Sequence, residues 1–146
     1  GAIGPFSADA YFSGGSTATY PNPIDTSQVQ NPAPQQVYQT ERWGSDFTYT
    51  IPNLTPGATY TVRLHFAEVY FTDHPKGKRI FNVAINDQPV LTNFDIAATA
   101  HGANIAIVEP FPATALTDGT IRIHFTNGPA NEAKISGIEI LPSSQG

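Results

Sequence analysis

The chain has 146 residues, the length of one ordinary domain with a single hydrophobic core. Twelve acidic residues against seven basic ones give a formal charge of −5, so the chain lacks the positive face that binds phosphates and we expect no nucleic-acid partner. Cysteine is absent, which excludes disulfide and thiolate chemistry, and no apolar run is long enough to span a membrane, so we expect no membrane partner.

The chain opens with a polar stretch that contains many prolines and has no regular period. Residues 14–36 read GGSTATYPNPIDTSQVQNPAPQQ, which fits neither a helix nor a strand. Loops of this length are uncommon in a compact domain unless they have a function. We therefore predict a long connection with a role of its own.

Alternation of apolar and polar residues then marks four strands, each with one buried face. The alternating runs cover residues 47–51, 60–66, 81–85 and 121–125. Residues 86–88 (NDQ) predict a hairpin turn, and the alternation shifts near Gly137, where we expect a bulge. The only helical turn that we expect lies within residues 96–104. Short strands at this spacing predict an all-β fold, an antiparallel β-sandwich.

Aromatic residues near the predicted loops are the first candidates for a binding site. They are Tyr20 in the long connection, Trp43 after YQTER, and the adjacent pair Tyr70 and Phe71 where a strand ends. Neighbouring residues in a regular strand point to opposite faces, so one ring of the pair should face solvent unless the strand bends. Exposed rings can stack on the C–H face of a sugar, although packing at the edge of the sandwich is an equally ordinary use for each ring alone.

The acidic residues show no pattern of a catalytic pair. Glycosidases need two carboxyl groups that converge in a cleft, and nothing in the spacing brings two acids together here. The adjacent Glu41 and Arg42 favour a structural ion pair. We found no nucleophile elbow, no Ser-His-Asp order and no phosphate-binding glycine loop, and we predict that the chain is not an enzyme.

The four histidines lack the spacing of metal ligands. His65 and His124 fall on the polar faces of strands, where we expect exposed side chains. His74, beside the aromatic pair, is a candidate hydrogen-bond donor to a ligand. Asp73 next to it could contribute to a structural calcium site, although calcium needs several oxygen ligands. No other cofactor is expected.

Five strings in order resemble the malectin family of carbohydrate-binding modules. They are VYQTERW, YTVRLHFAEVYF, KRIFNVAINDQPVLTNFDI, GANIAIVEPF and NEAKISGIEIL, and together they run from Val37 to Leu141. The chain looks most similar to bacterial malectin-like modules attached to larger secreted or envelope proteins. The resemblance implies a jelly-roll-like sandwich that binds oligosaccharide at one end.

The resemblance also suggests which residues bind. The ring after QTER corresponds to Trp43, the rings of EVYF to Tyr70 and Phe71, and a tyrosine in the preceding loop to Tyr20. An acid three positions before the lysine of the last strand corresponds to Asn131, which keeps a hydrogen-bonding side chain but loses the charge.

We therefore predict a single non-catalytic domain over residues 1–146, with residues 142–146 as the remnant of a linker. The expected partner is an oligosaccharide or polysaccharide of the glucose or plant cell-wall type, and the expected location is extracellular or in a cell envelope, within a larger multidomain protein. The main alternative is a protein-interaction or adhesion module that uses the same rings as anchors. A small hydrolase or lyase on a similar sandwich is the third reading.

Overall fold

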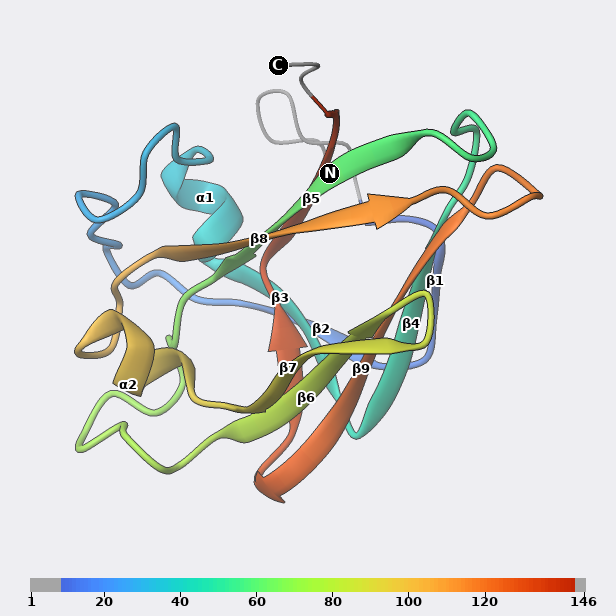
Figure 1. Ribbon diagram of the computed structural model, residues 1–146. Coiled ribbons are helices and arrows are strands. Elements are labelled where there is room, and N and C mark those ends of the chain that lie inside the picture. The colour runs from blue at the N-terminus through green and yellow to red at the C-terminus, as the bar shows by residue number, and fades with distance from the viewer. Residues whose placement is uncertain (1–8, 144–146) are drawn as a thin grey trace.

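A computed structural model describes residues 9–143, and Figure 1 shows that they form an all-β fold with two short helices. The strands in chain order are β1 (Phe12–Ser13), β2 (Ser16–Thr19), β3 (Thr40–Gly44), β4 (Asp46–Ile51), β5 (Thr59–Phe66), β6 (Ile80–Ile85), β7 (Gln88–Phe94), β8 (Ile107–Thr114), β9 (Ile121–Ala130), β10 (Ala133–Ile135) and β11 (Gly137–Pro142). The helices are α1 (Gln35–Tyr38) and α2 (Ile96–Ala100).

The strands form the two layers of a sandwich, and the paired strands are antiparallel. One layer is a five-stranded sheet in the order β1-β4-β9-β6-β7, and the other is made of two three-stranded sheets, β10-β3-β2 and β11-β5-β8. Apolar side chains from both layers pack between them. Those less than 2% exposed are Phe47, Val62, Leu64, Phe66, Phe81, Val83, Ile121, Ile123, Phe125 and Ala133. The predicted antiparallel β-sandwich is confirmed.

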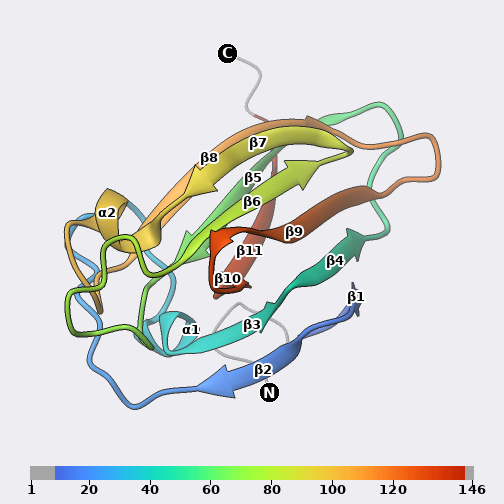
Figure 2. The same ribbon diagram turned by 90° about the horizontal axis from the view of Figure 1, so that it is seen from below.

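Two stretches of chain pass from one sheet to another with a single residue between the strands. Ser45 separates β3 from β4, which Figure 2 shows following one another along the same side of the molecule. Ser136 separates β10, which pairs with β3, from β11, which pairs with β5. The shift expected near Gly137 is therefore a change of pairing partner. It lets Ile135 and Ile138 both pack against the main core.

The alternating runs predict the strands well because each run has one face in this core. The predicted turn at residues 86–87 joins β6 to β7, and both its residues have positive φ (Asn86 49°, Asp87 68°), as the tight hairpin turn requires. The predicted helical turn is α2, which Asp95 caps by accepting a hydrogen bond from the Ala98 N–H (3.0 Å). Helix α1 was not predicted, since its four residues carry no period.

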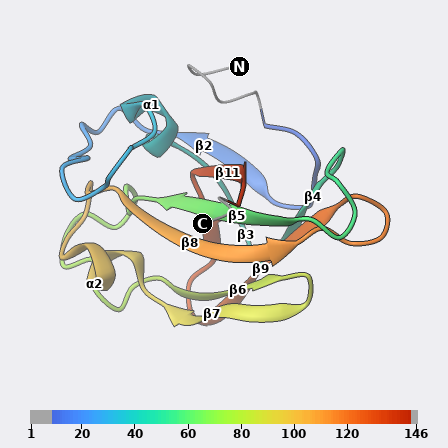
Figure 3. The ribbon, with the colours of Figure 1, turned by 45° about the horizontal axis from the view of Figure 1, so that its top comes forward.

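The long connection between β2 and β3 closes on itself and covers part of the outer face of the sandwich. Its ends meet where the Tyr20 N–H donates to the Gln39 carbonyl (2.8 Å). Its apolar residues form a second, smaller core with residues that follow β5. The buried members are Ile24, Ala33, Val37, Tyr38, Ala67, Val69 and Ala106. Figure 3 shows that α1 and α2 lie at the same end of the molecule, opposite the β4–β5 and β8–β9 connections.

Two of the expectations for polar residues are wrong. Glu41 and Arg42 do not pair, because neighbouring strand residues point to opposite faces: Glu41 binds Lys134 (2.5 Å) and Arg42 binds Asp9 (2.6 Å). His65 is fully buried, because the long connection covers the strand face on which it lies, whereas His124, whose side chain is 41% exposed, reaches solvent in part.

At the C-terminal end, β11 includes Pro142, which lies opposite Tyr60 of β5. The Ser143 N–H donates to the Thr59 carbonyl (3.2 Å). The first two residues of the expected linker are thus attached to the sandwich. Residues 144–146 lie outside the described part of the chain.

Candidate functional site

The loop after β5 presents two aromatic rings at the end of the sandwich that carries the helices. The strand ends at Phe66, so Tyr70 and Phe71 do not follow strand alternation. Instead, the buried Glu68 carboxylate oxygen Oε2 accepts the backbone N–H groups of Tyr70 (3.2 Å) and Phe71 (3.3 Å). This turn holds both rings on one side of the loop, with centroids 4.8 Å apart, and leaves Tyr70 60% exposed.

A third ring comes from the long connection. Tyr20 packs edge to face against Tyr70, with centroids 6.4 Å apart and the ring planes at 69°. Its position is fixed by the hydrogen bond to Gln39, which joins the end of the connection to the start of β3. Burial raises the pKa of the Tyr20 hydroxyl, and the negative charge of nearby Glu41 adds to the rise. Tyr20, Tyr70 and Phe71 therefore form one aromatic cluster from two distant segments.

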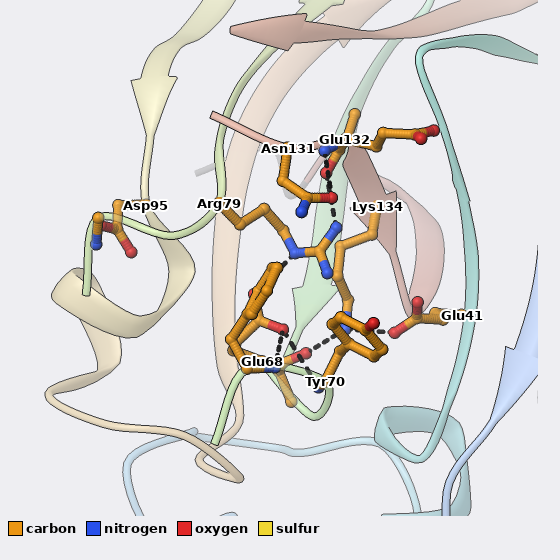
Figure 4. Close-up of polar contacts among 12 residues, drawn as sticks. Glu41, Glu68, Tyr70, Arg79, Asp95, Asn131, Glu132 and Lys134 are labelled. Atoms are coloured by element: carbon orange, nitrogen blue, oxygen red, sulfur yellow. Dashed lines mark hydrogen bonds and ion pairs between the residues drawn. The ribbon is translucent and has the colours of Figure 1, made fainter. Parts of the chain in front are cut away.

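Two buried ion pairs lie close to this cluster, and Figure 4 shows them beside Tyr70. Arg79 Nε donates to Glu68 Oε1 (2.7 Å), and both side chains are 5% exposed or less. Lys134 Nζ, which is fully buried, donates to Glu41 Oε1 (2.5 Å) and to the Ala67 carbonyl (2.6 Å). Burial lowers the pKa of Lys134, while the carboxylates of Glu41 and Glu68 act in the opposite direction. Because each buried charge is paired with an opposite one, Glu41, Glu68, Arg79 and Lys134 form a rigid and nearly neutral support for the cluster. We call these four side chains the polar floor.

Trp43 and Asn131 border this floor. Trp43 lies opposite Lys134 in the β3–β10 ladder and two residues after Glu41, so the three side chains leave the same face of the sheet. Asn131 is exposed, has positive φ (54°), and uses Oδ1 to accept the Glu132 N–H (2.8 Å). Figure 4 shows Asn131 beside the Arg79 side chain.

His74 is the candidate that the structure leaves apart from the cluster. Its side chain is 91% exposed and is paired with Asp73 (2.7 Å), which is 89% exposed. No contact with the three rings accompanies this pair in the part of the chain that the structure describes. For the calcium site proposed at Asp73, no group of three acidic or histidine side chains close enough to hold a metal ion occurs within residues 9–143.

Sequence reasoning missed the polar floor. The sequence patterns assign no binding role to Glu68, Arg79 or Lys134. In the structure, a cation neutralises Glu68 and another neutralises Glu41, so neither carboxylate is placed to serve as a free acid or base. The partners are 11 and 93 residues apart in the sequence, and no local pattern reveals such pairs.

Two grooves elsewhere on the described surface contain none of the six candidate residues. The larger, of about 370 Å³, lies between the long connection and the outer face of the β11-β5-β8 sheet, with Gln28, Arg63, Pro110 and Leu141 in its lining. The smaller, of about 210 Å³, is lined by Thr48, Asp87, Arg122 and His124. Neither is lined by an aromatic ring.

Comparisons with known proteins agree with this fold. The model of the Malectin domain family matches residues 4–139, so the chain belongs to the Malectin domain family. This is a family of non-catalytic carbohydrate-binding modules whose members bind oligosaccharides.

Similar proteins come from animals and plants. Malectin-B of Xenopus laevis is 30% identical over 123 residues, which cover 76% of this chain and 44% of the frog protein. Kinesin-like protein KIN-14R of Arabidopsis thaliana is 34% identical over 119 residues, which cover 82% of this chain and 10% of the plant protein. The chain thus spans less than half the length of these relatives, and homologous domains sit within larger multidomain proteins.

Among solved structures, the ANX2 ectodomain from Arabidopsis thaliana superimposes with a TM-score of 0.81 over 92% of this chain and 42% of that one. Sequence identity is 21%, so this likeness supports the fold. Such structural neighbours are extracellular ectodomains of receptor kinases. Within residues 9–143, neither helix has the length and apolar character needed to cross a membrane.

Proposed function

We propose that the chain binds a saccharide against the aromatic cluster of Tyr20, Tyr70 and Phe71, with Trp43 and Asn131 at its border. The observation that carries this proposal is the state of Tyr70: its ring is 60% exposed, yet Glu68 fixes its backbone and two rings support it. An exposed but rigid ring loses little conformational entropy when a sugar stacks on it. Affinity is expected in the range of about micromolar to millimolar, as the burial of a few rings allows.

The angles between the rings favour individual sugar chains over a flat surface. Tyr70 meets Tyr20 at 69° and Phe71 at 81°, so the three rings form a corner and are not coplanar. A single pyranose ring can enter such a corner, whereas the face of a crystalline polysaccharide would touch only one ring at a time. We propose soluble glucose-type or plant cell-wall oligosaccharides as ligands, inside a larger extracellular or envelope protein. A bacterial source stays a prediction.

The test compares two tyrosines that are equally exposed at different places. Tyr70→Ala is expected to lower affinity about fivefold or more without unfolding the domain, because removal of a stacked ring costs about 1 kcal/mol or more. Tyr11→Ala is the matched control, since Tyr11 is 58% exposed but lies beside β1, on another part of the surface. Calorimetry and affinity gels over a polysaccharide panel give the affinities. Equal affinity of wild type and Tyr70→Ala would refute the proposed site.

A protein-binding function is the second candidate, and the exposed rings favour it in part. Tyr11, Phe12 and Leu141 are each more than 40% exposed, and such side chains serve as anchors in protein interfaces. One structural neighbour was crystallised as a complex of the plant peptide RALF23 with FER and LLG2. Silence on a glycan array, combined with capture of a protein that Tyr70→Ala no longer captures, would support this alternative over saccharide binding.

A further inference from the structure

Arg79 is a nearly buried cation that joins two parts of the candidate site. Its Nε donates to Glu68, which holds the aromatic loop, and its Nη1 donates to the Glu132 carbonyl (2.6 Å) in the turn that carries Asn131. Its guanidinium carbon lies 5.3 Å from the centre of the Phe71 ring. Two of the three guanidinium nitrogens are thus committed to protein acceptors.

The third nitrogen, Nη2, has no hydrogen-bond partner among residues 9–143. It is not sealed inside the protein either, because Ser136 Oγ is the one fully enclosed side-chain polar atom without a partner among these residues. Figure 4 shows the guanidinium near Asn131 and Glu132 as well as Glu68, and its carbon lies 5.3 Å from the centre of the Phe71 ring, which belongs to the cluster. A donor on a residue that is only 4% exposed therefore opens toward the ring cluster.

Several acceptors near the rings are already engaged by other donors. Glu68 Oε1 accepts from Arg79, and its Oε2 accepts two backbone N–H groups. Glu41 Oε1 accepts from Lys134, and Asn131 Oδ1 accepts from Glu132. Asn131 has no charge that would attract the guanidinium away. An acceptor that comes from a ligand is the complement that this arrangement lacks.

We propose that Arg79 Nη2 donates a hydrogen bond to a hydroxyl oxygen of a saccharide ring stacked on Tyr70. This inference rests on the proposed function and names a feature of the ligand: a pyranose with an equatorial hydroxyl. When the C–H face of a pyranose covers Tyr70, its equatorial hydroxyls project outward in the plane of the ring and can meet a donor at its edge. Because protein acceptors already hold two of its nitrogens, the guanidinium loses little conformational entropy when it binds a ligand. A lysine ammonium could not make the same set of hydrogen bonds.

The experiment is a cycle of ligand and protein variants. Four glucose disaccharides (maltose, nigerose, cellobiose and laminaribiose) are titrated calorimetrically, and monodeoxy analogues of the tightest one are then compared on wild type and Arg79→Lys. We expect one analogue to bind wild type about tenfold more weakly, and the same deletion to cost little further affinity in Arg79→Lys, since the hydrogen bond is already lost. If each analogue lost the same affinity on wild type as on Arg79→Lys, the proposal would be overturned. A merely structural role of Arg79 would give that result, since no hydrogen bond to the ligand would then depend on it.

A second measurement covers the case in which Arg79→Lys does not fold. In wild type, ¹⁵N spectra of the arginine side chains should show the Arg79 Nη2 protons shifting and exchanging more slowly with water when the disaccharide is added. Unchanged signals at saturation would overturn the proposal. If Tyr70→Ala loses binding while Arg79 shows no response, the saccharide site stands and only the role of Arg79 falls. If none of the four disaccharides binds wild type, glucose-type saccharides are excluded as ligands, and both the proposed site and the role of Arg79 are refuted for them.

Discussion

Two buried polar clusters hold loops onto the sandwich, and they are built from different chemistry. The ring-side cluster lies beneath the exposed rings and consists of Glu41, Glu68, Arg79 and Lys134. The loop-side cluster lies beneath the long connection and consists of Tyr38, Arg63, His65 and Glu139. The first contains two nearly buried ion pairs, whereas the second combines a buried imidazole with one partly exposed ion pair, Arg63–Glu139.

In the loop-side cluster, one carboxylate oxygen organises two side chains. Glu139 Oε1 accepts from Arg63 Nη1 (2.8 Å) and from His65 Nε2 (2.5 Å). Arg63 also donates to the carbonyls of Gln30 and Asn31, and His65 Nδ1 meets the Tyr38 hydroxyl (2.8 Å). The long connection is therefore held by groups whose hydrogen bonds depend on the protonation of one histidine, whereas two pairs of opposite charges keep the binding loop in place in the ring-side cluster.

The largest expected effect comes from removing the buried cation of the ring-side cluster. Lys134→Met keeps the volume but leaves Glu41 buried without its partner and removes the hydrogen bond to Ala67. Breaking one side of a buried ion pair costs about 3–5 kcal/mol, so we expect a loss of that size in the free energy of unfolding. Urea denaturation measures it.

The double variant Lys134→Met, Glu41→Gln sharpens this test. Replacing both charges removes the unpaired carboxylate, so the double variant should recover much of the stability. If the free energy of unfolding of Lys134→Met lay within about 1 kcal/mol of wild type, the pair of Lys134 and Glu41 would not stabilise the domain as a buried ion pair.

A smaller effect is expected from the loop-side cluster when the Tyr38 hydroxyl is removed. Tyr38→Phe leaves the Ala33 N–H (3.2 Å from the hydroxyl) and the His65 Nδ1 without this partner in a buried place. An unsatisfied buried polar group costs about 1–3 kcal/mol, and the loss should appear in denaturation curves. Tyr60→Phe is the control, since the Tyr60 hydroxyl accepts from the exposed Thr55 N–H, where water can replace it.

The contrast also explains what could be predicted from the sequence. Alternation identified β4, β5, β6 and β9 because each has a face in one continuous core. The rings Tyr20 and Tyr70 could be proposed from their places near loops, and the structure brings them into contact. Buried polar clusters could not be found this way. The alternation in its strand placed His65 on the polar face and so predicted that it is exposed. That face is covered by the long connection, which starts 45 residues earlier in the chain, and the strand's own sequence does not show this.

The smallest expected effect is a dependence of stability on pH that comes from His65. Burial lowers the pKa of His65 below the ordinary value of 6.5, although Glu139 acts in the opposite direction and Arg63 supports the lowering. The hydrogen bonds agree with a neutral ring, which donates from Nε2 to Glu139 and accepts the Tyr38 O–H at Nδ1. A protonated ring would have to donate to a tyrosine oxygen that already accepts the Ala33 N–H.

The sign of the effect follows from proton binding in the two states. Below pH 6.5 the unfolded chain binds a proton at this histidine before the folded chain does, so the stability that the neutral His65 contributes is present above that pH and is lost as the pH falls. Denaturation midpoints between pH 8 and 5 should therefore decline toward acid in wild type, and the decline should be shallower in His65→Gln. His74→Gln, at a side chain that is 91% exposed, should leave the slope unchanged. The same slope in His65→Gln as in wild type would assign the acid sensitivity to other groups.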